Sequence, residues 1–233
     1  MNGRPFEEQV AGVAALNEPL RRRLYELVAS HDGPVSRDEA ATALGIPRSV
    51  AAFHLDKLAD AGLCEVEFRR TLTRSGPGAG RPAKFYCRSA RPVEVSVPPR
   101  RYQLAARLLA EAMVQADAGQ QPVADSLRQV AQEFGASLGQ EANRRAGRRP
   151  TRDDLVGAVV EVLAEHGYEP RREGRRVLLS NCPFDELARE HTDLVCSMNC
   201  DLLAGLADGT QPRRLQARLE PSAARCCVVL DVI

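Results

Sequence analysis

The sequence predicts an α+β fold, in which an N-terminal winged helix-turn-helix precedes a mixed α/β domain with helices on a small antiparallel sheet. The first observation behind this prediction is a run of helical patterns joined by tight turns between residues 16 and 60. The second is a pair of short alternating segments, 63–68 and 84–87, on either side of a glycine-rich loop. The third is the alternation of helical stripes with short strand patterns over residues 151–233.

The N-terminal helices are indicated by apolar periodicity and by capping residues. Leucines and a valine recur at helical spacing over residues 16–30. Ser36 and Glu39 form a capping-box pattern that opens a second helix, which ends at Gly45. Pro47 is suited to the first position of a third helix, which runs to about residue 60 and ends before Gly62. Helices at this spacing predict a helix-turn-helix.

The third helix has two distinct faces. Ala51, Leu55 and Leu58 share the face expected to enter the core, and His54 beside them is expected to be a packed core histidine. The opposite face includes Ala52 and Asp56 and suits a DNA major groove. The residues expected to contact DNA from this helix are Arg48, Ser49, Phe53 and Lys57.

The hairpin after the third helix has a strongly basic character, although the whole chain has a formal net charge of only +1. Its glycine-rich tip allows the backbone to approach a phosphate or a minor groove, and Arg74, Arg81 and Lys84 are the expected contacts. Cys64 and Cys87 are expected on neighbouring strands as small buried residues, with a thiol site as the alternative. Between residues 69 and 100 one acid, Glu94, accompanies eight basic residues: Arg69, Arg70, Arg74, Arg81, Lys84, Arg88, Arg91 and Arg100.

Two segments of this half resemble the winged helices of ArsR-type regulators. Residues 53–63, FHLDKLADAGL, are similar to the recognition helix and exit turn of that family, and residues 80–86, GRPAKFY, are similar to its wing. The resemblance covers roughly residues 16–90 and implies binding to a double-stranded DNA operator. A winged helix used only for protein contacts is the alternative, which the basic wing disfavours.

Three parts are expected along the chain: a DNA-binding domain at 1–92, a connector with dimerisation helices at 93–150, and a cysteine-containing sensor domain at 151–233. The stripe of Leu104, Leu108, Ala112 and Met113 suggests a helix of a homodimer, because helix-turn-helix regulators read paired half-sites. Packing of that stripe within one chain is the alternative.

The last part carries five of the chain's seven cysteines. Cysteine supplies soft anionic sulfur, which suits iron–sulfur clusters and zinc. No pair of CxxC knuckles is present, so a zinc ribbon is a poor interpretation. Buried thiols in a ligand-sensing or structural domain remain the alternative. The five are Cys182, Cys196, Cys200, Cys226 and Cys227.

This part also resembles the C-terminal half of SufR-type repressors, through Asn181-Cys182-Pro183-Phe184, the stretch 187–199 and Cys226-Cys227-Val228. That resemblance implies an iron–sulfur cluster that couples cluster or redox status to operator binding. By position, Cys182, Cys196 and Cys226 match cluster ligands, with Cys226 favoured over its neighbour. A fourth ligand is left open among Cys200, Cys227 and His191.

Other functions are weaker expectations. An enzyme with Cys182 or Cys196 as nucleophile and His191 as base is disfavoured, and a regulator that senses a small organic ligand is the main alternative. No apolar run approaches the ~20 residues that span a bilayer, and no secretion signal opens the chain, so a cytoplasmic protein without membrane contact is expected.

Overall fold

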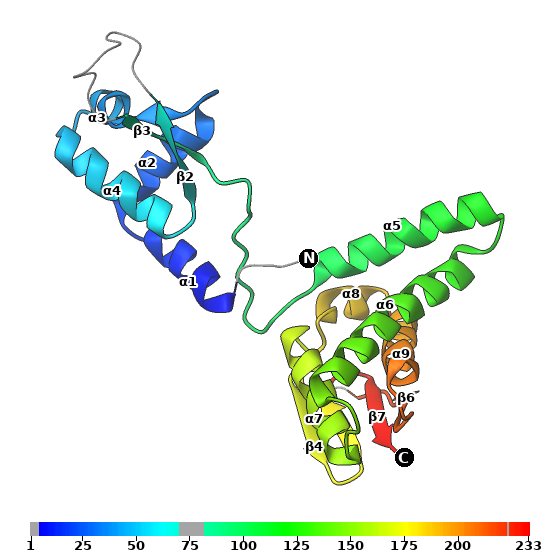
Figure 1. The fold of residues 1–233 in the computed structure, drawn as a ribbon. Coiled ribbons are helices and arrows are strands. Elements are labelled where there is room, and N and C mark those ends of the chain that lie inside the picture. The colour runs from blue at the N-terminus through cyan, green and yellow to red at the C-terminus, as the bar shows by residue number, and fades with distance from the viewer. Residues whose placement is uncertain (1–4, 70–81, 223) are drawn as a thin grey trace. The chain divides into compact units, whose positions relative to one another are not determined.

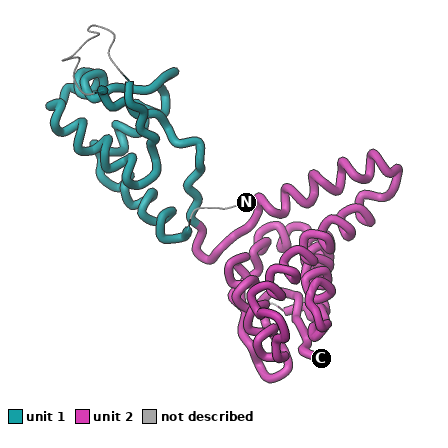
Figure 2. The backbone as a smooth tube through the Cα atoms, viewed as in Figure 1, with its two compact units in different colours: residues 1–95 teal, residues 96–233 magenta. Residues whose placement is uncertain are grey.

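The computed structural model describes residues 5–69, 82–222 and 224–233. The chain divides into two compact units, residues 1–95 and 96–233, which are called the N-terminal and C-terminal units (Figure 2). The boundary lies near the end of the expected DNA-binding domain, whereas the expected connector helices and the cysteine-containing part share one unit. No helix in the described ranges combines the length and apolar character needed to cross a membrane.

The N-terminal unit has helices packed on a small antiparallel sheet (Figure 1). Its core is formed by side chains from the helices together with buried Val35, Cys64 and Tyr86. Among the described residues, the sheet order is β1-β3-β2, and Cys64 of β2 is paired with Arg88 of β3. The elements are α1 (Phe6–Ala15), α2 (Pro19–Ser30), β1 (Val35–Ser36), α3 (Arg37–Leu44), α4 (Arg48–Asp60), β2 (Cys64–Arg69) and β3 (Ala83–Arg88).

The capping box at Ser36 and Glu39 is present, and Gly45 ends α3 in the left-handed conformation that favours glycine. Two helix starts differ from the sequence prediction. α2 begins at Pro19 because the Glu18 carboxylate accepts hydrogen bonds from the first backbone amides, so Leu16 lies before the helix. Pro47 is the residue before α4 and not its first helical residue. Helix α1 was not predicted from the sequence.

The C-terminal unit also combines helices with antiparallel strands, so the predicted α+β class is confirmed. Within the described residues the sheet order is β4-β5-β7-β6, with α7 and α9 packed against it and α6 packed on both helices (Figure 1). The elements are α5 (Tyr102–Gly119), α6 (Val123–Ala146), α7 (Arg152–Glu165), β4 (Pro170–Glu173), β5 (Arg176–Leu179), α8 (Asp185–Glu190), α9 (Thr192–Gly209), β6 (Leu215–Leu219) and β7 (Val228–Val232).

Helices α6 and α9 approach each other so closely that side chains are excluded from the crossing. A Cβ added at Gly135 would lie 1.8 Å from the Leu202 carbonyl oxygen, and one added at Gly205 would lie 2.1 Å from the Gln132 carbonyl oxygen. Gly139 and Gly209 repeat the contact one turn further along. Each helix therefore has a glycine pair at four-residue spacing that faces the other helix, and α9 is held by backbone-to-backbone packing.

The α5 stripe expected at a dimer interface is divided between the core of the unit and the solvent. Leu108 and Ala112 are fully buried within the unit, whereas Met113 is 63% exposed. The buried face is continued by Ala105 and Ala116 and packs against α6. Helix α5 and the first turns of α6 extend away from the body that α7, α9 and the sheet form (Figure 1).

Candidate DNA interface and thiol cluster

Helix α4 presents the side chains that the sequence assigned to a DNA groove. Ala51, Leu55 and Leu58 are fully buried, which anchors the opposite face of the helix in the core. Arg48, Ser49 and Lys57 are exposed, and Phe53 is 58% exposed. A solvent-facing aromatic ring between two cations is an arrangement that can enter a major groove. His54 is half-buried, with Nδ1 3.4 Å from the Glu18 carboxylate, which agrees with a packed histidine.

Asp56 has a structural role that the sequence analysis missed, because it was placed on the groove face. Its carboxylate accepts hydrogen bonds from Arg37 Nη2 at 2.6 Å, Lys84 Nζ at 2.8 Å and the Tyr86 hydroxyl at 2.7 Å. These donors lower the pKa of Asp56 against the opposing effect of burial. Burial raises the pKa of Tyr86 to about 12, so it remains a hydroxyl donor. The contacts join α3, α4 and β3.

The cations expected at DNA differ in how far they are already paired. Arg48 lies 2.6 Å from Asp38, and both side chains are largely exposed. Lys57 is 3.6 Å from Asp60. Lys84 forms an ion pair with Asp56. The sequence analysis had instead expected Lys84 to contact a DNA phosphate. Arg74 and Arg81 lie outside the described residues.

Four cysteines meet at one end of the C-terminal sheet. Cys182 follows β5, and Cys226 and Cys227 precede β7, whose pairing with β5 brings these chain ends together. The Cys226 amide donates to the Leu179 carbonyl at 3.0 Å. Cys196 is supplied by the first turns of α9. We call Cys182, Cys196, Cys226 and Cys227 the thiol cluster.

The side chains of the thiol cluster influence one another's pKa values in a chain. Cys226 interacts with both Cys182 and Cys227, and Cys227 interacts in turn with Cys196. The interaction with the protonated Cys226 thiol lowers the pKa of Cys182 and lowers that of Cys227 to about 6. The pKa of Cys226 is strongly raised because its interactions with Cys182 and Cys227 favour the protonated thiol, and burial adds to the effect. Burial, followed by the hydrogen bond to Cys227, raises the pKa of Cys196 to about 12.

Two buried polar side chains, Tyr168 and Asn199, form a hydrogen-bonded relay that ends at the Cys226 sulfur. The Tyr168 hydroxyl donates to Asn199 Oδ1 at 2.6 Å, and Asn199 Nδ2 donates to Cys226 Sγ at 3.2 Å. Tyr168 and Asn199 are each 1% exposed, and burial raises the pKa of Tyr168 well above its ordinary value. The relay leaves the Cys226 sulfur with a fixed donor whether or not the thiol keeps its proton.

The remaining fourth-ligand candidates lie further from this network. Cys200 is half-buried, and burial raises its pKa; its interaction with Cys227 is electrostatic. His191 is exposed at the junction of α8 and α9. Cys64 and Cys87 belong to the N-terminal unit, on β2 and β3 as expected, and burial raises the pKa of Cys64 to about 12. Within the described residues, no three His, Cys, Asp or Glu side chains are already arranged to hold a metal ion.

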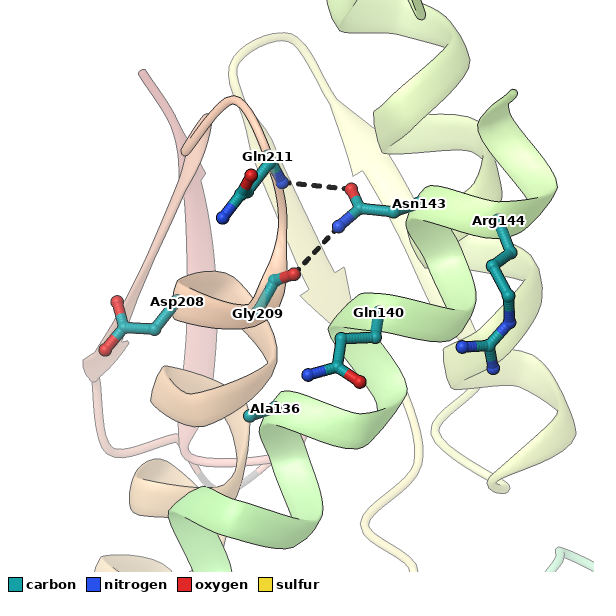
Figure 3. Close-up of a pocket in the computed structure, with 7 residues that line it drawn as sticks. All are labelled: Ala136, Gln140, Asn143, Arg144, Asp208, Gly209 and Gln211. Atoms are coloured by element: carbon teal, nitrogen blue, oxygen red, sulfur yellow. Dashed lines mark hydrogen bonds between the residues drawn. The ribbon is translucent and has the colours of Figure 1, made fainter. Parts of the chain in front are cut away.

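A surface hollow of about 560 Å³ lies where the last turns of α6 and α9 meet (Figure 3). The side chain of Asn143, one of its lining residues, donates to the Gly209 carbonyl and accepts from the backbone amide of Gln211. The Arg144 side chain points to one side of the hollow in Figure 3. The thiol cluster does not contribute to its lining, so the hollow is a separate feature.

The sequence analysis found the cysteines but missed the residues that support them. Tyr168 follows an apolar helix and Asn199 lies within one. A single polar side chain in such a pattern does not indicate a functional role. The glycines at 135, 139, 205 and 209 offered a readable signal, because two glycine pairs at four-residue spacing in helical segments indicate close helix contact.

Comparison with known proteins adds support for the N-terminal unit. Residues 16–67 match a family described as a helix-turn-helix domain, over less than half of the chain. The match spans α2 to β2 and includes the exposed face of α4. No curated protein matches the chain significantly.

Proposed function

Because the chain carries the helix-turn-helix domain of a DNA-binding transcriptional regulator, we propose that its C-terminal unit binds an iron–sulfur cluster and that cluster loading controls operator binding, with repression as the output. The observation that carries this proposal is that Cys182, Cys226 and Cys227 lie at the paired ends of β5 and β7, where the Cys226 amide donates to Leu179, and that Cys196 of α9 interacts with Cys227. Iron–sulfur clusters are held by cysteine thiolates, and four thiols at one site match that donor set.

Each ligand has a distinct origin in the fold. Cys182 is on the turn after β5, Cys196 is on α9, and Cys226 and Cys227 precede β7. Ligation requires deprotonation, and the neighbouring Cys226 thiol lowers the pKa of both Cys182 and Cys227. The cluster would supply a charged centre that responds to oxidants. The residues themselves would bind it, exclude water from the buried Cys226 side and hold the surrounding elements together.

Cys227 is our choice for the fourth ligand. It contacts both Cys226 and Cys196, whereas Cys200 and His191 lie off the hydrogen-bonded chain. Ligation would deprotonate both adjacent cysteines, which removes the interaction of the Cys226 thiol with Cys227 in the metal-free protein. Side-chain rotation must then separate the sulfurs enough to meet two ligand positions.

We also propose a homodimer through α5. Its exposed stripe is symmetric about Ala110, with Ala106 four residues before it and Val114, which is 72% exposed, four residues after it. A twofold axis at Ala110 sets the small Ala106 of one chain opposite the larger Val114 of its partner. Met113→Glu and Val114→Glu should each produce monomers in sedimentation equilibrium.

The decisive experiment is anaerobic purification followed by iron and sulfide analysis and visible absorption. Bound iron with sulfide and a broad visible band is expected for the wild-type protein. Serine at Cys182, Cys196, Cys226 or Cys227 should deplete iron, whereas Cys64→Ser and Cys87→Ser are matched controls that should retain it. If wild-type protein remains colourless after reconstitution with iron and sulfide, the proposal is refuted. Loss of iron in Cys64→Ser would show that the site lies in the N-terminal unit and not in the C-terminal unit.

A further inference from the structure

Residues 99–101 lie near the start of the C-terminal unit, which begins at residue 96, and lead directly into α5. This short segment is hydrogen-bonded to the turn that carries Cys182. The Arg101 amide donates to the Pro183 carbonyl at 2.9 Å, so the residue that precedes α5 is tied to the residue next to a proposed ligand.

The Arg100 side chain makes the second connection. Its guanidinium donates to the Asn181 side-chain oxygen and, at 3.1 Å, to the Cys182 carbonyl. It also lies 3.5 Å from the Asp185 carboxylate. The side chain is only 19% exposed, so these contacts are partly shielded from water. A planar guanidinium with several fixed acceptors holds its partners in a defined geometry.

Asn181 makes the reverse connection from the turn to the segment. Its amide nitrogen donates to the Pro99 carbonyl at 2.9 Å and to the Gly167 carbonyl. Asn181 is 7% exposed, and the space at Gly167 is closed by Pro99, whose Cβ would be 3.0 Å from an added side-chain carbon. The segment and the turn therefore hold each other through reciprocal contacts.

We propose that this clamp, formed by Pro99, Arg100, Arg101, Asn181 and the Cys182–Asp185 turn, transmits ligation at Cys182 to the chain segment that leads to the DNA-binding unit. The inference rests on the proposed cluster. Ligation would fix the Cys182 sulfur at the cluster, and so would change the backbone position preferred by the turn. The Arg100 guanidinium and the Arg101 amide are hydrogen-bonded to that turn. Residues 99–101 therefore move with the turn. Arg100 and Asn181 are thus positioning residues for regulation.

The test compares DNA affinity in the cluster-loaded and cluster-free forms of the full-length protein. The ratio of the two dissociation constants measures the coupling free energy. In Arg100→Ala the ratio should move toward one, whichever form binds DNA more tightly, while the iron content and the visible spectrum stay unchanged. Arg100→Lys keeps the charge but loses the planar contacts, so it should lie between. Arg172→Ala breaks an ion pair with Asp153 elsewhere in the unit and should leave the ratio unchanged.

Hydrogen exchange provides the second measurement and does not depend on DNA. Loading wild-type protein with iron and sulfide should change exchange at the Cys182–Asp185 turn and at the Arg101 amide. In Arg100→Ala and Asn181→Ala the change should remain at the turn and be lost at Arg101. Normal coupling in both variants with iron bound would overturn the clamp alone. If the wild-type protein takes up no iron, or if its DNA affinity is the same with and without the cluster, the proposed function is overturned as well.

Discussion

Asp56 and Lys84 form an ion pair of 2.8 Å that ties helix α4 to strand β3. Both side chains lie on the side of the unit that the sequence assigned to DNA, yet their charges offset each other. Arg37 adds a second cation to the same carboxylate. The pairing makes Asp56 a determinant of how much positive charge this surface presents to phosphates.

Asp56→Asn should strengthen binding to duplexes of any sequence, because Lys84 and Arg37 lose their shared counter-charge. The slope of log K against log salt should steepen by about one unit if one cation is freed to contact a phosphate. Lys84→Ala should leave the slope nearly unchanged. Fluorescence anisotropy over a salt series measures both. A slope reduced by about one unit in Lys84→Ala, with no change in Asp56→Asn, would show that Lys84 leaves Asp56 for a phosphate.

Arg48 should contribute to sequence preference, because it is exposed at the start of α4. Arg48→Ala should relax discrimination at one base pair by about 1–3 kcal/mol, measured by competition with single-substitution operators. Asp38→Ala is the matched control, since it removes the partner 2.6 Å away and leaves the arginine in place. Uniform weakening across all operators in Arg48→Ala would identify a phosphate contact.

Cys227 should be the first thiol of the cluster-free protein to react with iodoacetamide, because donation from Cys226 lowers the pKa of Cys227 to about 6. Mass spectrometry of each cysteine over a pH series should place its labelling midpoint near that value. Cys226→Ala should move the midpoint upward, because the main stabilising donor is removed. Cys200, whose pKa is raised by burial, is the internal control. Equal labelling midpoints for these two thiols would contradict the hydrogen-bonded chain.

Asn199→Leu should lower the reduction potential of a bound cluster, because a hydrogen bond to a ligand sulfur stabilises the more negative reduced state. Tyr168→Phe should shift the potential in the same direction by less, since it frees the Asn199 amide without deleting it. Spectroelectrochemistry measures the shift, and thermal melts separate it from loss of folding. A potential unaffected by Asn199→Leu in a folded, iron-loaded protein would remove the relay from the site.

Gly135→Ala and Gly205→Ala should each destabilise the C-terminal unit by about 3 kcal/mol or more, because the added carbon overlaps backbone of the opposite helix. Gly157 on α7 is the matched control, because it is exposed with nothing within 4 Å of an added Cβ. Gly157→Ala should stabilise the protein by roughly 0.5–1 kcal/mol through helix propensity. Denaturant unfolding measures the free energy of unfolding of all three variants. An unchanged value in Gly135→Ala would show that α6 and α9 can move apart at little cost in free energy.

Local patterns were sufficient to predict the helix-turn-helix and most strand positions. The Ser36–Glu39 capping box and the apolar stripe of α4 are short-range signals, and each appears in the structure. The start of α2 was wrong because a glutamate cap at Glu18 overrode the apolar repeat. Arg100, Asn181 and Asp56 could not be assigned from the sequence, because their roles depend on partners 14 or more positions away in the chain.

The glycine crossing of α6 and α9 also defines how relatives of the C-terminal unit can be sought. Any chain that keeps this backbone contact must keep residues without side chains at four places, whatever else has diverged. The combination of Gly135 and Gly139, then Gly205 and Gly209, placed around Cys182 and Cys196, is a compact fingerprint. A search with this spaced pattern could identify distant members in which overall identity has faded.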